Sequence, residues 1–359
     1  MNFGYTSVMN TIFLIIMLLV TTAIFGLPIW NLARLKGSRH PLWMIAPPVF
    51  FIGLFGLNRV LETYEMTTLF KIIRTLSFYW LILGVMLFGF SLVIFFVQKT
   101  FKVSNQKTFW LTIGITILLG LISLINGQRI VVKELSLPAS NITRTYSFVH
   151  ITDLHAGSTD VRHAQRVVDK ITPLNAEFMV ITGDFIDEFY VAPADIEPFN
   201  DLAIPTYLIT GNHEYYLETG TIENVISQSN IQLIDDMRIE YDELDIIGVN
   251  ELATVDATLD VLGGIQLDRY TILLDHQPKT DEVIRASERG VDLMLSGHTH
   301  NGQIWPVGWL ISLRNKYVGG LYEIGDMFLY VNQGTGTLGP KMRFGTVNEI
   351  TLITLEPAQ

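Results

Sequence analysis

The chain has 359 residues, with 24 Lys and Arg against 35 Asp and Glu, a formal net charge of −11 and no cysteine. The lack of cysteine excludes disulfides and thiolate metal sites, so a bound metal needs ligands from His, Asp, Asn or water. The acidic balance argues against a nucleic-acid partner, because phosphate backbones are held mainly by Lys and Arg.

The charge is divided unevenly along the chain. Residues 1–127 hold nine Lys or Arg and two acids, Glu62 and Glu65, and so carry +7, whereas residues 128–359 carry −18. The first part is also strongly apolar. This contrast predicts two domains, a transmembrane anchor over 1–127 and a separately folded domain over 128–359.

Four apolar stretches in the first part predict membrane spans, at about 8–30, 41–57, 76–97 and 109–125. The first and third reach the roughly 20 apolar residues that cross a bilayer, and the second and fourth are shorter. Pro47 and Pro48 remove backbone donors inside the second stretch, which favours a kink or an interfacial or re-entrant segment there. A cleaved signal peptide is the alternative for the first stretch, but no basic region precedes it.

Basic residues in the short loops predict the orientation of the anchor, because cytoplasmic loops are enriched in Lys and Arg. The loops after the first and third stretches hold three basic residues each and no acid, namely Arg34, Lys36, Arg39 and Lys99, Lys102, Lys107. The longer loop after the second stretch also holds three, diluted by both acids. We therefore expect an integral, multi-pass cell-membrane protein with residues 128–359 on the outer or periplasmic face.

From about residue 128 the pattern changes to short β-branched runs that alternate with amphipathic segments. A helix is predicted over 161–171, and strands over 129–135, 146–152, 178–182, 206–210, 245–249, 270–274, 291–296, 327–332 and 349–355. Strands that alternate with helices early and form hairpins late predict an α/β layered sandwich with mixed sheets.

Histidine, aspartate and asparagine follow five of these strands directly. The segments are Asp153-Leu154-His155, Gly183-Asp184, Gly211-Asn212-His213-Glu214, Asp275-His276 and Gly297-His298-Thr299-His300. In an α/β sheet, the loops at the carboxyl ends of the strands converge on one crevice. We therefore expect these side chains to form a single site.

The spacing within the segments favours metal binding. Two ligands at i and i+2, as in Asp153/His155 and His298/His300, point to one side of an extended backbone. The glycines before Asp184, Asn212 and His298 allow sharp turns and a close approach to an ion. Seven N and O ligands are too many for one four-coordinate zinc, and they suit two divalent ions that share a carboxylate.

Each short segment has a plainer explanation when taken alone, since an isolated Asp-x-His is commonly a turn and Gly-Asp carries little information. All five in this order form a specific pattern. The other histidines are expected to be structural: His40 in a loop near a membrane end, His150 within a strand, and His163 on a polar helix face.

This series of motifs resembles the calcineurin-like metallophosphoesterase superfamily over residues 128–359. The strings ITDLHAG, ITGDFID, ITGNHEYY and SGHTHNGQI look most similar to its membrane-associated bacterial branch, which includes enzymes acting on lipid phosphodiesters and on UDP-diacylglucosamine. The resemblance implies a four-layer αββα sandwich with mixed sheets.

The resemblance also implies a role for each residue. The first metal would be held by Asp153, His155 and His300, the second by Asn212, His276 and His298, with Asp184 bridging both. His213 would face the phosphorus and protonate or stabilise the leaving oxygen. Glu214 would orient His213 through a hydrogen bond or serve a structural role.

Such a centre would use two divalent ions to activate a shared water as the hydroxide that attacks phosphorus. Mn²⁺, Fe²⁺, Zn²⁺ and Mg²⁺ all suit the ligands, and we favour Mn²⁺. The anchor favours membrane lipids as partners, and a phosphodiester or pyrophosphate bond of a lipid as substrate.

The segment Trp305–Ile311 contributes two tryptophans that either contact the membrane interface or pack on the sheet. The alternatives to a lipid hydrolase are an enzyme acting on a soluble nucleotide or sugar phosphate and a non-catalytic metal-binding membrane scaffold. Intact candidate ligands at all seven positions argue against the scaffold.

Overall fold

A computed structural model describes residues 18–358, apart from 64–66, 188–190, 218–219 and 267. The chain divides into two compact units, Met1–Ser123 and Leu124–Gln359. Each unit is described by itself below.

The first unit is helical, because its residues are almost uniformly apolar and lie in long uninterrupted runs. Its elements are η1 (Thr22–Gly26), α2 (Leu27–Leu35), α3 (Leu42–Thr63), α4 (Thr67–Phe101) and α5 (Asn105–Gln128), which ends in the second unit. Helix α3 continues through Pro47 and Pro48.

The described residues contain three helices that are long and apolar enough to cross a bilayer, Leu18–Leu35, Ile72–Phe101 and Asn105–Gln128. The prediction of four spans is therefore not supported. The apolar part of α3, Leu42–Leu57, is shorter than a full span, since 16 residues rise only about 24 Å against a core of about 30 Å. The fourth predicted stretch is longer than expected, and part of the first, 8–30, lies outside the described residues.

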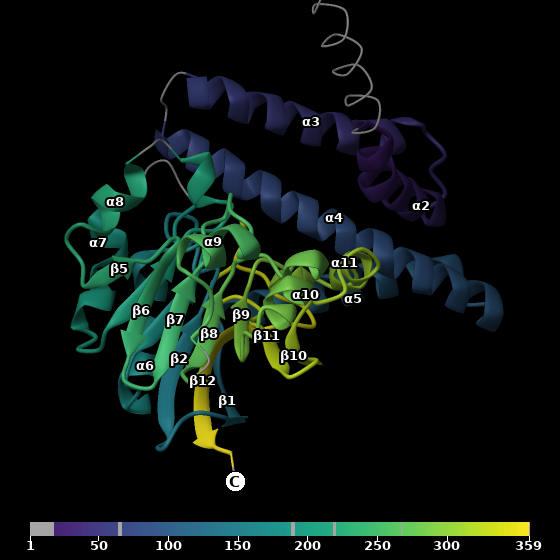
Figure 1. Ribbon diagram of the computed structural model, residues 1–359. Helices are drawn as coiled ribbons and strands as arrows, with labels where there is room; N and C mark the ends of the chain where they lie inside the picture. Colours follow the sequence, from purple (N-terminus) through teal and green to yellow (C-terminus); the bar gives the residue numbers. More distant parts are fainter. Residues whose placement is uncertain (1–17, 64–66, 188–190, 218–219, 267, 359) are drawn as a thin grey trace, which may run out of the picture. The chain divides into compact units, whose positions relative to one another are not determined.

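The second unit contains two six-stranded sheets (Figure 1). The first has the order β1 (Ile130–Ala139), β12 (Asn348–Pro357), β2 (Tyr146–Ile151), β3 (Met179–Thr182), β4 (Thr206–Ile209), β5 (Ile231–Leu233). The second has the order β10 (Gly320–Ile324), β11 (Met327–Val331), β9 (Leu293–Ser296), β8 (Tyr270–Leu274), β7 (Leu244–Gly248), β6 (Met237–Tyr241).

Both sheets are mixed, as predicted. In the first, β2 to β5 are parallel and β12 runs antiparallel to β2. In the second, β7, β8, β9 and β11 are parallel, and β6 and β10 are antiparallel edge strands. The parallel strands bring their carboxyl ends to a common edge within each sheet.

Shorter helices and turns connect the strands of the second unit. The α-helices are α6 (Val161–Ile171), α7 (Pro193–Ile196), α8 (Thr221–Ile226), α9 (Val255–Val261), α10 (Thr280–Glu288) and α11 (Val307–Ser312). The 3₁₀ turns are η2 (Thr172–Leu174), η3 (Glu197–Asp201), η4 (Glu214–Tyr216) and η5 (His300–Gly302).

Three buried apolar clusters hold these layers together. One joins α6, η3 and α8 to the outer face of the first sheet, one lies between the two sheets, and one joins α9 and α10 to the outer face of the second sheet. Strand β8 shows the division, since Ile272 and Leu274 face the first sheet and Leu273 faces the helices, as the two-residue period of a strand requires. The layers therefore follow the order helix, sheet, sheet, helix.

The predicted helix over 161–171 is confirmed, but its polar face is not where it was expected. His163 is buried, with its Nε2 2.8 Å from the carbonyl oxygen of Thr335. Burial lowers the pKa of His163 to about 4, so the ring is neutral at pH 7. The prediction failed because His163 shares the inward face of α6 with Val167 and Ile171.

Three strands, β5, β6 and β10, were not predicted. Each stands at the edge of its sheet. An edge strand is partly exposed and short, so it has no continuous apolar run for the sequence to reveal.

We expect Leu293→Ala to lower the free energy of unfolding by about 2–5 kcal/mol, because it opens a cavity in the cluster between the sheets. Leu293 is fully buried there. Denaturant unfolding of the full chain in detergent measures the change. The matched control is Leu252→Ala, since Leu252 is 75% exposed; equal losses in the two variants would contradict the described core.

Candidate dinuclear metal centre

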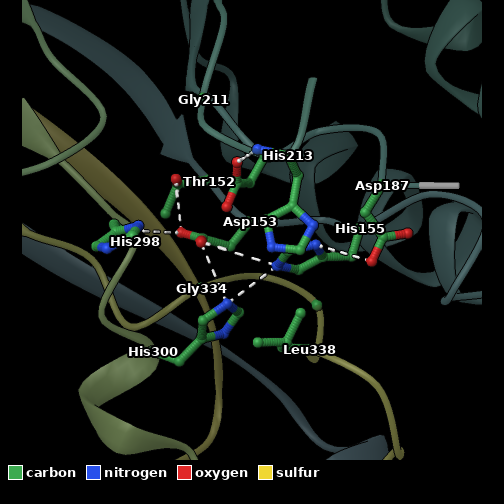
Figure 2. A network of polar contacts seen from close by, with 12 residues as sticks. Thr152, Asp153, His155, Asp187, Gly211, His213, His298, His300, Gly334 and Leu338 are labelled. Atoms are coloured by element: carbon green, nitrogen blue, oxygen red, sulfur yellow. Dashed lines mark hydrogen bonds and ion pairs between the residues drawn. The ribbon is translucent and has the colours of Figure 1, made fainter. Parts of the chain in front are cut away.

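The candidate ligands lie in loops that leave the carboxyl ends of β2, β3, β4, β8 and β9. The first three strands are neighbours in one sheet, and β8 and β9 are neighbours in the other. Because the inner faces of the two sheets pack on each other, the five loops reach one region. Figure 2 shows residues of the loops after β2, β3, β4 and β9 there, and His276 of the loop after β8 lies 3.1 Å from Asp184. The structure thus brings the predicted residues together.

The first cluster consists of Asp153, His155 and His300, all buried. Nε2 of His155 is 3.0 Å from Nε2 of His300, which is 3.2 Å from Oδ1 of Asp153. The other oxygen of Asp153, Oδ2, accepts hydrogen bonds from Thr152 Oγ1 at 2.8 Å and His298 N at 3.0 Å. Those bonds leave Oδ1 directed at the two imidazoles (Figure 2).

The second cluster consists of Asp184, His276 and His298. Nδ1 of His276 donates a hydrogen bond to the carbonyl oxygen of Thr182 at 2.7 Å, which assigns the ring proton to Nδ1 and leaves Nε2 as a ligand atom. Nε2 is 3.1 Å from Asp184 Oδ2. Burial opposes protonation, but Asp184 raises the pKa of His276 well above its usual value. A metal ion would compete with that proton for the same lone pair.

The polar atoms of these clusters test whether metal ions fit them. Asn212 Oδ1 is buried and makes no hydrogen bond within the described part of the chain, and leaving such an atom unpaired costs about 1–3 kcal/mol. Asp153 Oδ1 and His276 Nε2 contact other candidate ligands, His300 Nε2 at 3.2 Å and Asp184 Oδ2 at 3.1 Å. Divalent cations would give all of these N and O atoms a common partner. The residues therefore fit a metal centre.

The two buried carboxylates are ionised, as metal ligands must be. Burial is the largest single influence and raises their pKa values, but the neighbouring histidines together outweigh it, with His300 foremost at Asp153 and His276 at Asp184, so both pKa values lie below the usual range. These negative charges offset the cost of placing a cation in a buried site.

The backbone differs from the extended form that the i, i+2 argument assumed. Asp153, His155, Asp184, His298 and His300 have φ values of 52°, 53°, 49°, 70° and 48°. Residues other than glycine rarely adopt such left-handed angles, which cost about 1–3 kcal/mol each and persist only when the surroundings impose them. The paired ligands therefore converge through tight left-handed turns, and not through strand alternation.

The predicted role of the glycines is met at Gly183 and Gly211. Gly183 has a φ of +83°, and a Cβ there would lie 2.7 Å from His276 Nδ1. Gly211 needs no unusual angle, but a Cβ there would overlap Asp184 Oδ1. Both glycines allow the ligand loops to pack directly on one another.

Glu214 binds backbone amides and not the ring of His213. Its carboxylate accepts hydrogen bonds from the amides of Gly211 at 2.8 Å, Ile186 at 2.9 Å and Asp184 at 3.0 Å. No hydrogen bond joins Glu214 to the His213 ring among the described residues. The structural alternative therefore explains Glu214, which ties the loop after β3 to the loop after β4.

His213 lies beside the first cluster, outside the two predicted ligand sets (Figure 2). It forms a third group with His155 and Asp187, whose ligand atoms also lie within 4.8 Å of one another. Its ring is perpendicular to the His155 ring, with centroids 4.8 Å apart, and its other neighbour is Tyr216 at 5.6 Å. Its backbone amide donates to Asp184 Oδ1 at 2.8 Å. Burial and then the charge of His155 lower the pKa of His213.

Asp187 is a site residue that the sequence reasoning missed. Its Oδ2 lies 3.1 Å from Nδ1 of His155, and its carboxylate accepts from Ser158 N at 3.1 Å and Ser158 Oγ at 2.8 Å. A carboxylate on the far nitrogen of a ligand histidine fixes the ring and its tautomer. The spacing Gly183-Asp184-x-x-Asp187 was the available signal.

Arg343 was also missed, and no sequence pattern marks it. This fully buried guanidinium donates to the carbonyl oxygens of Gln333 at 2.9 Å, Gly334 at 3.1 Å and Gly336 at 2.6 Å. Its Nη2 is 3.3 Å from Nδ1 of His300. Burial lowers the pKa of Arg343 to about 10, so it stays charged at neutral pH and fixes both this loop and the His300 ring.

The two remaining histidines are structural, as predicted. His150 is buried, with Nε2 2.9 Å from Thr182 Oγ1, and burial lowers its pKa to about 3. His40 is exposed, and its Nδ1 accepts a hydrogen bond from Leu42 N at 3.2 Å.

We expect Asp184→Asn to reduce metal binding at both clusters, because the substitution removes the charge of the predicted bridging carboxylate. Elemental analysis of the dialysed protein should give fewer ions per chain than the parent. The control is Asp169→Asn on the exposed face of α6. An unchanged metal content in Asp184→Asn would refute the bridging role.

Residues 146–302 match the family model for calcineurin-like phosphoesterases. An uncharacterized metallophosphoesterase of Campylobacter jejuni is 32% identical over 240 residues, which cover 63% of this chain and 63% of the relative. A transmembrane protein with metallophosphoesterase domain of Bos taurus is 31% identical over 291 residues, which cover 73% and 65%. The crystal structure of TT1561 of Thermus thermophilus aligns with 54% of this chain and 90% of that chain, at a TM-score of 0.39 and 12% identity.

This chain therefore spans slightly less than two thirds of the length of these two curated relatives. The match to the bovine protein takes in part of the helical unit, because 73% of 359 residues is about 262, more than the 236 residues of 124–359. Together with the three apolar helices, this supports a membrane protein. The second unit is thus similar to calcineurin-like phosphoesterases over residues 146–302, the segment that holds both clusters.

Proposed function

We propose that the protein is a membrane-bound, metal-dependent phosphoester hydrolase that cleaves a phosphodiester or pyrophosphate bond of a membrane lipid. The observation that carries the hydrolase part is the pair of His and Asp clusters, together with the buried Asn212 Oδ1, which has no hydrogen-bond partner among the described residues. The lipid part rests on the apolar helices and on an exposed apolar helix beside the site.

Asp153, His155 and His300 would hold one ion, and Asn212, His276 and His298 the other, with Asp184 between them. Divalent ions, of which we favour Mn²⁺, supply charge that neutralises the phosphate oxygens and acidity that makes water a nucleophile near neutral pH. Asp187 and Arg343 keep the rings of His155 and His300 in place.

His213 is the proposed proton donor. Water adds to the phosphorus and releases a proton to the solvent, the bond to the leaving oxygen breaks, and that oxygen takes a proton from the His213 imidazolium. The products are a phosphomonoester and an alcohol when a diester is cleaved. The lowered pKa of His213 makes its imidazolium a stronger acid but reduces the fraction of the ring that is protonated near neutral pH.

Helix α11 supports a lipid substrate. None of its residues is buried, and Trp309, Leu310 and the following Leu313 are 60%, 52% and 64% exposed. Packing on the sheet therefore does not account for this segment. Exposed tryptophan and leucine with basic residues nearby are typical of surfaces that enter the membrane interface, and Arg314 and Lys316 follow directly.

Helix α11 is also connected to the site itself. It packs on η5, the turn that begins with His300, and a Cβ at Gly302 would overlap the backbone of Gly308. A single residue, Arg129, separates the candidate span α5 from β1. This short connection would hold the second unit at the bilayer surface, where lipid headgroups are available.

We expect His213→Ala to retain metal and to lose about 10²–10⁴ in kcat, because it removes the proposed proton donor. The full chain in detergent is assayed with added Mn²⁺ on a chromogenic phosphodiester, with metal content measured in parallel. His40→Ala is the control. Loss of metal from His213→Ala would instead make His213 a ligand, and an inactive but metal-loaded parent would contradict the hydrolase.

We expect replacement of both Trp305 and Trp309 by Ser to reduce hydrolysis of phospholipid in vesicles several-fold more than hydrolysis of a small chromogenic diester. The control replaces Leu252 and Val261 by Ser, since these residues are 75% and 80% exposed elsewhere on the second unit. Equal losses on both substrates would exclude a docking role for this segment.

A further inference from the structure

The helical unit contains a basic cavity of about 500 Å³ that the proposed hydrolase mechanism does not use. Its walls come from α2, α4, α5 and the segments that follow α2 and α4, all within Met1–Ser123. The lining includes four cationic residues, Arg34, Arg39, Lys99 and Lys102. The cationic residues that line the basic cavity therefore come from the loops that follow the first and third apolar stretches.

The four cations face no acidic side chain among the described residues of this unit. No Asp or Glu lines the basic cavity, and none of the four forms an ion pair within the part of the chain that the structure describes. Their aromatic contacts, Arg34 over Trp30 and Lys99 over Phe95, do not cancel charge. Cations gathered around one space repel each other, and a bound anion would remove that repulsion.

Neutral hydrogen-bonding groups accompany the cations. The lining also contains amide and hydroxyl side chains, those of Asn31, Ser91, Gln98, Asn105, Thr108 and Thr112. The Gln98 amide donates to Asn105 Oδ1 at 2.8 Å, which fixes one pair of them. The hydroxyls of Ser91, Thr108 and Thr112 donate to helix carbonyl oxygens. The cations combined with the amides of Asn31 and Asn105 therefore supply the donors that match the acceptor oxygens of a phosphate.

An apolar groove of about 260 Å³ adjoins the basic cavity. The two share the lining residues Pro28, Asn31, Ser91 and Phe95, and the groove continues along Leu27, Phe88 and Leu92. A ligand that fills both must have an anionic end and a hydrocarbon end. Free phosphate satisfies only the first requirement.

We propose that the basic cavity binds the phosphate headgroup of an anionic membrane lipid, with an acyl chain in the adjoining groove. Basic pockets between transmembrane helices are suited to acidic headgroups, and each Lys or Arg adds favourable interaction with an anionic lipid. The site lies in the helical unit, so it is independent of the proposed hydrolase activity.

The test is lipid binding to the full chain in neutral detergent, measured by native mass spectrometry and by thermal shift. The probes are a phosphatidylglycerol, a phosphatidylcholine with the same chains, glycerol 3-phosphate and inorganic phosphate. We expect binding and stabilisation by phosphatidylglycerol well above the other three. Equal effects of phosphatidylcholine would overturn the headgroup assignment, and equal effects of the two chain-free phosphates would overturn the lipid assignment.

Substitutions of the lining residues test whether phosphatidylglycerol binds at the basic cavity. Replacing Arg34 and Lys99 by Gln should weaken phosphatidylglycerol binding about 10- to 30-fold, whereas exchanging their identities as Arg34→Lys with Lys99→Arg should largely preserve it. The control Lys107→Gln removes a basic residue that does not line the cavity. Undiminished binding by the Gln pair, or an equal loss in Lys107→Gln, would refute the proposal.

Hydrolysis of a small chromogenic diester separates this proposal from the proposed function. The Gln pair should keep the parental rate while losing lipid binding, because both substitutions lie in the helical unit. Lipid binding that persists in an enzyme without hydrolase activity would leave the basic cavity supported and the proposed function refuted.

Discussion

In the second unit, the fold holds several ligand nitrogen and oxygen atoms closer together than these atoms would lie without it. Two imidazole nitrogens 3.0 Å apart and a carboxylate oxygen 3.2 Å from one of them form the first cluster. The left-handed backbone of five candidate ligands adds a further cost. Such an arrangement persists only because the surrounding fold and, by inference, bound cations stabilise it.

Buried charged groups outside the ligand sets provide much of that stabilisation. Glu214 joins two ligand loops through three amides, Asp187 orients His155, and Arg343 holds the loop around Gly334 against His300. The contacts of Glu214 with the Asp184 amide, of Asp187 with His155 and of Arg343 with His300 each join a candidate ligand to a segment that is distant in sequence. The apolar cluster between the sheets fixes the strands from which these loops depart.

The sequence predicts the site better than it predicts the geometry that forms the site. Buried strands such as β8 and the helix over 161–171 were identifiable because their apolar periodicity is regular, and their polar ends then located the ligands. Edge strands lack a continuous apolar run. A left-handed turn at a residue other than glycine, such as Asp153, has no sequence pattern that would predict it. Arg343 was invisible because its importance arises from burial next to a residue 43 positions away.

The division of charge along the chain constrains how the proposed lipid hydrolase would meet its substrate. A domain carrying −18 is repelled by an anionic bilayer over roughly one Debye length, about 8–10 Å at physiological salt. Close approach must then use a local surface that is apolar or basic. The stretch from Trp305 to Lys316 has both properties, and it is joined to the turn of His300.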